Sequence, residues 1–228
     1  MTGTLINVLL VVIGSLIGVT LRQKLPTKYG RTLLQGIALF VLYLGWQMAQ
    51  ETTNSLIPLF SIIGGAIIGE AIDIEARLNR LSNRLEKRYS RGDDQFTKAF
   101  VGSSLLFIVG PMAILGSIND GLYNDSSLLI AKSMMDGFSS IAFASTMGIG
   151  VLFSALPILV YQGSLTLGAI LVKDFFTPQI IAEMTATGGL LILGIGINML
   201  EIGKIAVGNL LPAIPLAVLG TFLLNLIA

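Results

Sequence analysis

The stretch TLINVLLVVIGSLIGVTL, residues 4–21, decides the fold because it carries no charged residue and is long enough to cross a bilayer as a helix. A spanning helix needs about 20 predominantly apolar residues. Further windows of this kind fall at about residues 32–50, 55–72, 98–118, 126–148, 149–172, 186–203 and 208–227. The sequence therefore predicts an all-α fold, a polytopic membrane bundle of about eight (seven to nine) spanning helices, in a single transmembrane domain over residues 1–228.

The composition agrees with this prediction. Apolar residues make up 54% of the chain and charged residues only 12%, and the mean hydropathy is +0.84. These values are far from those of ordinary soluble domains. The chain has no cysteine and no histidine, so thiolate and imidazole ligands are excluded. Any ion chemistry must use oxygen ligands or lysine, which favours alkali or alkaline-earth cations.

Two windows form a single, mostly apolar stretch over residues 126–172. We expect the chain to divide at Gly148-Ile149-Gly150, where two glycines permit a sharp turn. The alternative is a re-entrant or broken segment around Asp136-Gly137, which would change the number of spans by one.

The basic residues indicate an orientation. Most of them follow the first and third windows: Arg22, Lys24, Lys28, Arg31, Arg77, Arg80, Arg84, Lys87, Arg88, Arg91 and Lys98. Loops rich in Lys and Arg face the cytoplasm. The loops predicted on the opposite side are acidic and carry Glu51, Asp120, Asp125, Asp174 and Glu183. Eight spans would place both termini outside.

Residues 73–91 combine basic side chains with an apolar stripe of Ile74, Leu78, Leu81 and Leu85. This spacing predicts a basic amphipathic helix on the cytoplasmic side. It would lie on the anionic leaflet or pack on a partner helix. The alternative is a solvated linker whose charges only fix the topology.

The first three windows resemble the last three. Gly14-Ser15-Leu16 matches Gly163-Ser164-Leu165, and the matches continue through Gly45 with Gly196 and Gly65 with Gly220. An offset of five spans reverses the direction of crossing, which predicts an inverted repeat of helices 1–3 and 6–8, as in many secondary transporters. The alternative is chance similarity between helices rich in Leu and Gly.

The segment AKSMMDGFSSIAFASTMGIG, residues 131–150, carries the main candidate site. Lys132 and Asp136 are four residues apart and share one helical face. A carboxylate near the membrane centre needs a partner or a solvated cavity. Gly137 could break the helix and free carbonyl groups, while Ser139 and Ser140 could add hydroxyl ligands. The alternative is a structural ion pair among small residues that favour close helix packing.

Two amide side chains lie at membrane depth outside this segment. Gln162 lies in the middle of the sixth window and Asn198 lies in the seventh. Either residue could line the same cavity as Asp136, or simply tie two helices together by hydrogen bonds.

A family resemblance rests on the same residues. The run from Lys132 to Phe138, the motif Gly148-Ile149-Gly150-Val151 and the tripeptide Tyr161-Gln162-Gly163 resemble the signature of the YqgA and YdfK family of bacterial inner-membrane proteins. The resemblance implies a multi-pass protein of the bacterial inner membrane with its basic loops in the cytoplasm. It also implies transport, since members of this uncharacterised family are regarded as candidate sodium channels or pumps and are associated with biofilm formation.

The favoured hypothesis is a secondary transporter or channel-like protein for a small cation or small polar solute. Its site would comprise Asp136, Lys132, Gly137, Ser139, Ser140, Gln162 and Asn198. We expect no enzyme activity and no cofactor, with a monovalent cation such as sodium as the candidate ligand. The expected partners are the lipid bilayer, the solute and a second copy of the chain in a homodimer, with no nucleic acid.

Two alternatives come from other classes of protein. A membrane scaffold or sensor would recruit a partner through residues 73–91 and would not need Asp136. An intramembrane hydrolase would need an activated nucleophile, and without His or Cys only a Ser–Lys or Asp–Asp device remains. The sequence offers little for either device.

Overall fold

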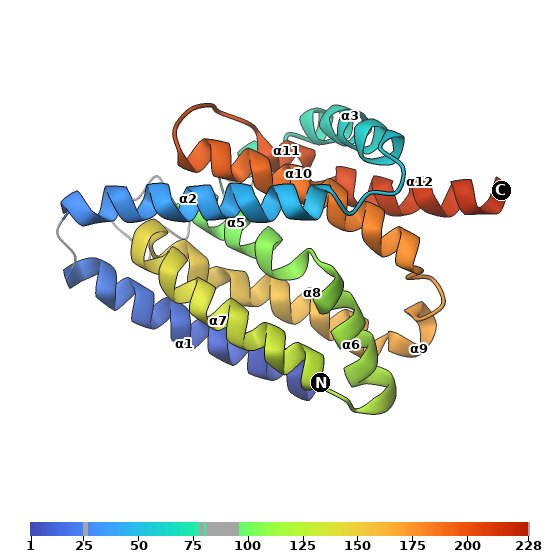
Figure 1. Cartoon of the computed structure of the whole chain (residues 1–228), viewed down its shortest axis with the longest axis horizontal. Coiled ribbons are helices and arrows are strands. Elements are labelled where there is room, and N and C mark those ends of the chain that lie inside the picture. The colour runs from blue at the N-terminus through green and yellow to red at the C-terminus, as the bar shows by residue number, and fades with distance from the viewer. Residues whose placement is uncertain (25–26, 78–79, 81–95, 228) are drawn as a thin grey trace. The chain divides into compact units, whose positions relative to one another are not determined.

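The computed structural model describes residues 1–24, 27–77, 80 and 96–227, and every regular element in those residues is a helix (Figure 1). The helices are α1 (Thr2–Lys24), α2 (Thr27–Ala49), α3 (Leu56–Ile72), α5 (Phe96–Ile108), α6 (Pro111–Tyr123), α7 (Ser127–Met147), η1 (Ile149–Ser154), α8 (Ala155–Leu167), α9 (Ala169–Val172), α10 (Pro178–Met199), α11 (Val207–Leu210) and α12 (Ala213–Ile227). The all-α prediction is confirmed.

The chain forms two compact units. Unit 1 comprises Met1–Ile37 and Leu85–Phe175, and unit 2 comprises Ala38–Arg84 and Phe176–Ala228. Helix α2 contributes its first half to unit 1 and its second half to unit 2. The single transmembrane domain predicted from the sequence stays a prediction.

The described helices include five that are long and apolar enough to cross a membrane: α1, most of α2, η1 with α8, α10, and α11 with α12. The bent pair α5 and α6 makes a sixth if it is one span. Helix α3 is shorter, with 17 residues, and the charged and hydroxyl side chains of α7 lower its hydropathy. The number eight therefore stays a prediction, while the membrane helices themselves are present.

The division at Gly148 is confirmed. Helix α7 ends at Met147, Gly148 adopts a positive φ of 85°, and the 3-10 helix η1 begins at Ile149. A positive φ is accessible to glycine without a steric penalty. The alternative break at Asp136-Gly137 is wrong, because α7 is continuous through both residues.

The window predicted at residues 98–118 is not one straight helix. It consists of α5 and α6, which meet at an angle of 58°. Gly110 and Pro111 lie at the bend, and Pro111 occupies the first turn of α6, where its missing N–H has no helical partner to lose. The bend separates two short helices that each pack inside unit 1.

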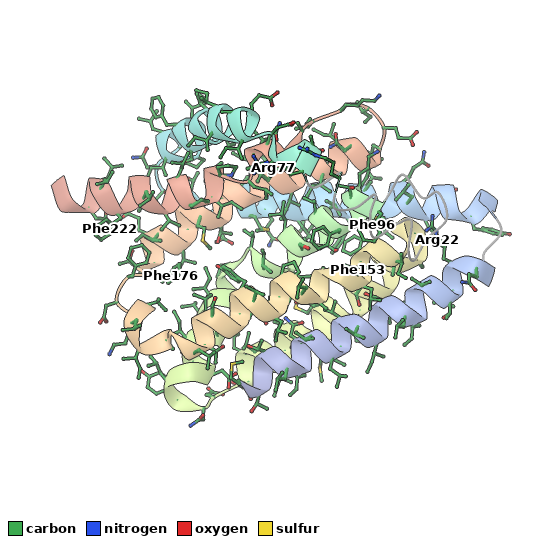
Figure 2. The ribbon with its side chains drawn as sticks, turned by 180° about the vertical axis from the view of Figure 1, so that it is seen from behind. Arg22, Arg77, Phe96, Phe153, Phe176 and Phe222 are labelled. Atoms are coloured by element: carbon green, nitrogen blue, oxygen red, sulfur yellow. The ribbon has the colours of Figure 1, made fainter. Side chains whose placement is uncertain are left out.

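Helix α1 packs along α7 and α8 within unit 1, and α1 and α7 lie side by side in Figure 1. Gly14 and Gly18 permit the close approach, since a Cβ at Gly14 would lie 2.4 Å from the Gly137 carbonyl oxygen. The small-xxx-small spacing thus serves a contact within the bundle. The rings of Phe96 from α5 and Phe153 from η1 are 5.2 Å apart and lie next to each other in Figure 2.

In unit 2 the second half of α2 packs on α10. A Cβ at Gly45 would meet Leu193, and a Cβ at Gly196 would meet Leu42. This reciprocity is what a local two-fold relation would produce, since Gly45 corresponds to Gly196 in the sequence repeat. Helix α3 packs on α12 in the same unit. The inverted repeat of helices 1–3 and 6–8 nevertheless stays a prediction.

Two acidic residues expected in loops lie inside helices instead. Asp120 lies in α6 and Glu183 lies in α10, and both are buried. Their charge lowered the local hydropathy and shortened the predicted windows. The basic helix predicted at residues 73–91 falls mostly outside the described residues, which show helix at 74–77 and at 80.

Candidate functional site

An ion pair lies in the interior of unit 1. Lys132 Nζ donates to Asp136 Oδ2, one helical turn along α7. Both residues are only 7% exposed. Their neighbours Met134, Met135 and Phe138 point to the outside of the bundle. The amphipathic pattern of α7 is therefore reversed relative to a soluble helix, with its charges inside and its large apolar side chains outside.

Two amides from neighbouring helices complete the cluster. Asn7 of α1 donates from Nδ2 to Asp136 Oδ2 at 3.0 Å and to Gln162 Oε1 of α8 at 3.2 Å. Both amide side chains are fully buried. We call these four residues, Lys132, Asp136, Asn7 and Gln162, the Asp136 cluster. It joins three helices that are far apart in the sequence.

The cluster has unsatisfied hydrogen-bonding capacity. Asn7 Oδ1 and Gln162 Nε2 are buried and have no protein partner. The orientation of both amides is fixed by the carboxylate: Asn7 must present its NH₂ group to Asp136, and Gln162 must then present its oxygen to that group. One acceptor and one donor therefore remain free beside the ion pair, whichever way the other groups relax.

An unsatisfied buried polar atom is costly, about 1–3 kcal/mol each. Native structures leave few such atoms, and those that remain often mark a water, an ion or a functional role. Asn7 Oδ1 could accept a hydrogen bond from a guest or, together with the Asp136 carboxylate, coordinate a cation, and Gln162 Nε2 could donate a hydrogen bond to a guest.

The other predicted site residues have different surroundings. Gly137 does not break α7; it lies against Leu10 of α1, where a Cβ would come within 3.2 Å of the Leu10 Cβ. Ser140 is buried and donates to the Gly137 carbonyl at 2.7 Å. Ser139 is half-buried on a neighbouring face of α7. The expectation that Gly137 frees carbonyl groups is wrong, because its carbonyl is bonded within the helix.

Asn198 belongs to unit 2. Its side chain donates to the Ile205 carbonyl at 2.7 Å and accepts from the Ile205 N–H at 2.8 Å. Both hydrogen bonds fix the turn that follows α10. The structure thus brings together Lys132, Asp136 and Gln162, and it assigns Asn198 to a loop contact.

Asn7 is the site residue that the sequence did not single out for chemistry. The available signal was one amide within the apolar run of residues 4–21. An isolated amide in a spanning helix indicates an interhelical hydrogen bond, but its partners come from residues more than 120 positions away.

A second buried carboxylate lies in unit 2. Glu183 of α10 is fully buried and accepts four hydrogen bonds from the loop between α2 and α3. Its donors are Thr52 Oγ1 at 2.6 Å, Thr53 N at 2.7 Å, Thr53 Oγ1 at 2.8 Å and Asn54 N at 2.9 Å. Both carboxylate oxygens are used, so this site is closed by its own chain.

In the part of the chain that the structure describes, no three His, Cys, Asp or Glu side chains converge on one point. The described residues therefore give no support for a metal site built from a cluster of carboxylates. The fold and the Asp136 cluster instead define a polytopic, all-helical membrane protein with an incompletely satisfied ion pair inside a helix bundle.

Comparison with known sequences shows the family of this chain. The profile of the family described as "Protein of unknown function (DUF554)" matches residues 2–222. The chain therefore belongs to this family. The resemblance identified from Lys132 to Gly163 is confirmed by this match.

Two relatives are similar over nearly their whole length. One is the "Uncharacterized membrane protein YdfK" of Bacillus subtilis (strain 168), 32% identical over 218 residues, which are 94% of this chain and 93% of the relative. Another is the "Uncharacterized protein YqgA" of Escherichia coli (strain K12), 32% identical over 220 residues, 94% of each chain. No solved structure matches the chain.

Proposed function

We propose that the protein is a secondary transporter or channel-like membrane protein that binds a small cation or small polar solute at the Asp136 cluster. The observation that carries this proposal is the pair of buried, unpartnered atoms, Asn7 Oδ1 and Gln162 Nε2, beside the Lys132–Asp136 ion pair. The protein would move its ligand without transforming it.

The energetic argument starts from the ion pair. Ionisable groups in a membrane interior are costly to insert and usually serve a pathway or a binding site. A pair kept only for packing would satisfy its remaining hydrogen-bonding groups, because partial satisfaction is worse than an apolar core. The Asp136 cluster does not do so. Its free acceptor and free donor support a role in binding a transient ligand.

The cluster also supports a cation as one class of ligand. Lys132 supplies a tethered positive charge to Asp136, and Asn7 Oδ1 is an unpartnered amide oxygen near the same carboxylate. A small cation that enters would compete with the Lys132 ammonium for Asp136. Such competition would give the protein a means of coupling the movement of the cation to the movement of a proton or of the lysine side chain.

The proposal includes an orientation in the bacterial inner membrane. Arg22 and Lys24 lie at one end of α1, and Lys98 begins α5 near that end. Basic residues favour the cytoplasmic side. The end of unit 1 at which α1 begins would then face the outside, together with the connection from α6 to α7.

The test is flux through purified protein in proteoliposomes, measured with a panel of monovalent cations and a pH-sensitive dye. Asp136→Asn alone leaves Lys132 without its partner, so the double variant Lys132→Met/Asp136→Asn is included to keep the interior neutral. Both variants should lose flux by about 10- to 100-fold, which corresponds to one charge-assisted contact.

The matched control is Met135→Leu, next to Asp136 on α7 but 62% exposed on the outside of the bundle. Its flux should equal that of the unaltered protein. Undiminished flux in the double variant, with folding confirmed by its chromatographic profile, would refute the site.

A further inference from the structure

Helices α1 and α8 are joined by successive polar side-chain contacts. Thr4 Oγ1 and Thr166 Oγ1 lie 3.3 Å apart, and one turn further into the bundle Asn7 bonds Gln162 at 3.2 Å. Thr4 and Asn7 are three residues apart on α1, while Gln162 and Thr166 are four apart on α8. The two helices therefore run antiparallel, with two polar layers stacked along their seam.

The next layer along the same seam is apolar. One turn beyond Asn7 on α1 lies Val11, and one turn beyond Gln162 on α8 lies Ile158. Both are completely buried. On this seam polar side chains return after another turn, at Ser15 of α1 and Ser154 of η1, both buried, and at the same level the buried Ser140 of α7 lies against Gly14. The Asp136 cluster thus borders a polar layer on one side and an apolar layer on the other.

The polar side continues to the end of unit 1. Asp120 of α6 is buried there and accepts the Gly3 N–H at 3.2 Å. The loop that carries the exposed Asp125 belongs to the same end, because Asp125 lies between α6 and α7. Backbone and side-chain polar groups therefore follow one another from this end to Asn7.

The spacing of the polar side chains favours the passage of water or a small ion between Asn7 and the end of unit 1 at which α1 begins. The helical rise between Thr4 and Asn7 is about 4.5 Å, which one water molecule or one small ion can bridge. From Asn7 to Ser15 the rise is about 12 Å, and the intervening layer of Val11 and Ile158 offers no hydrogen-bonding side chain.

We infer that the Asp136 cluster is reached from the end of unit 1 at which α1 begins, past the hydroxyls of Thr4 and Thr166, and that Val11 and Ile158 form the barrier toward the other end. This inference deepens the proposed function, since it assigns the entry route of the same binding site. The route suits water, protons and small hydrophilic solutes that exchange hydrogen bonds with hydroxyl groups.

Cysteine accessibility tests the route directly, because the natural chain contains no cysteine. Single variants Thr4→Cys, Thr166→Cys, Val11→Cys and Ser15→Cys are placed in membrane vesicles of both orientations and treated with a membrane-impermeant thiosulfonate. Asp125→Cys marks which face carries the start of α1. The cysteine thiolate, which forms only where water reaches it, attacks the thiosulfonate and forms a mixed disulfide, and a sulfinate leaves.

The expected result is that Thr4→Cys and Thr166→Cys react from the Asp125 face at least about tenfold faster than Val11→Cys and Ser15→Cys, which lie beyond the polar layers. The matched control is Leu5→Cys, adjacent to Thr4 at the same depth but 56% exposed on the outside of the bundle. It should stay unreactive, because lipid and not water surrounds it.

Three results would overturn the inference. Ser15→Cys could react faster than Thr4→Cys, Leu5→Cys could react as fast as Thr4→Cys, or neither Thr4→Cys nor Thr166→Cys could react. Two entry positions are used so that poor folding of one variant still leaves a reading. The labelling requires no transport, so absent flux with the predicted labelling would refute the proposed function and leave the route intact.

Discussion

Two buried carboxylates, Glu183 and Asp136, have opposite surroundings. Glu183 in unit 2 receives four hydrogen bonds from one short loop, and both of its oxygens are occupied. Asp136 in unit 1 receives a lysine and an amide at the same oxygen, Oδ2. Unpartnered atoms on Asn7 and Gln162 remain beside it.

This difference separates structure from function. A carboxylate held by backbone N–H groups and hydroxyls of its own chain closes a loop and has no capacity left for a ligand. A carboxylate held by a flexible lysine can exchange that partner, and the amides around Asp136 have bonds still to make. We therefore expect Glu183 to determine stability and Asp136 to determine activity.

The largest effect on stability should come from Glu183→Leu. Removing the carboxylate leaves the N–H groups of Thr53 and Asn54 and two hydroxyls without an acceptor, at about 3–5 kcal/mol in total. Unfolding in mixed micelles, followed by circular dichroism, would measure the loss. Glu183→Gln keeps one acceptor, so its stability should lie between that of the unaltered protein and that of Glu183→Leu. A Glu183→Leu protein as stable as the original would show that the loop does not depend on this acid.

The next effect concerns the ion pair. Asp136→Asn and Lys132→Met should each cost about 3 kcal/mol, because each leaves one buried charge alone. The double variant should recover most of that stability, since an ion pair replaced by neutral groups is often close to neutral in energy. A double-mutant cycle on the same unfolding signal measures the recovery. Additive losses would mean that the two groups do not interact.

A smaller effect should follow when α1 is moved away from α7. A Cβ at Gly14 would lie 2.2 Å from Ser140 Oγ and 2.4 Å from the Gly137 carbonyl, so Gly14→Ala should destabilise by about 1–2 kcal/mol. It should also weaken ligand binding, because Asn7 lies on the displaced helix.

Gly163→Ala is the control for that variant. At Gly163 a Cβ would meet only the end of the Met1 side chain at 3.7 Å. The better helix propensity of alanine should then stabilise α8 by up to about 1 kcal/mol. The same melting experiment compares both variants, and equal shifts would exclude a special role for the α1–α7 contact.

The smallest effect is expected for Asp125, which lies outside both the Asp136 cluster and the Glu183 site, and it concerns the pKa of this carboxyl group. The side-chain and backbone hydrogen bonds of Ser127 hold the pKa of Asp125 below its ordinary value of 3.8. This depressed pKa means that the interaction contributes fully above about pH 4 and is lost as the pH falls through the folded-state pKa. Ser127→Ala removes the side-chain hydrogen bond but keeps the one from the backbone N–H, so it should raise the pKa part of the way toward 3.8 and cause a slight loss of stability at pH 7, where the interaction is present. A carboxyl NMR titration would detect the change, and an unchanged midpoint would exclude the side-chain hydrogen bond as a cause of the depressed pKa.

The sequence predicted those features that depend on local spacing. Lys132 and Asp136 are one turn apart, so their pairing follows from helix geometry, and the glycines at 148 and 150 indicated the end of α7 correctly. Long stretches without charge were sufficient to predict the membrane helices.

Features that depend on distant partners were not predictable. Glu183 shortened the predicted window because its charge lowers hydropathy, and only the loop at residues 52–54 explains why the helix can bury it. Asn198 is an asparagine like Asn7, yet its partner is the backbone of Ile205. Asn7 became recognisable only when α1, α7 and α8 were in contact.

The most direct test of the central claim is an experimental density map of the Asp136 cluster in a lipid nanodisc, at a resolution that shows ordered water. The account predicts density for a water, cation or solute within about 3 Å of Asn7 Oδ1, and density for a water or solute that accepts a hydrogen bond within about 3 Å of Gln162 Nε2. A cluster packed dry, with both atoms against apolar side chains and no density between them, would contradict it and would leave the ion pair a role in helix packing.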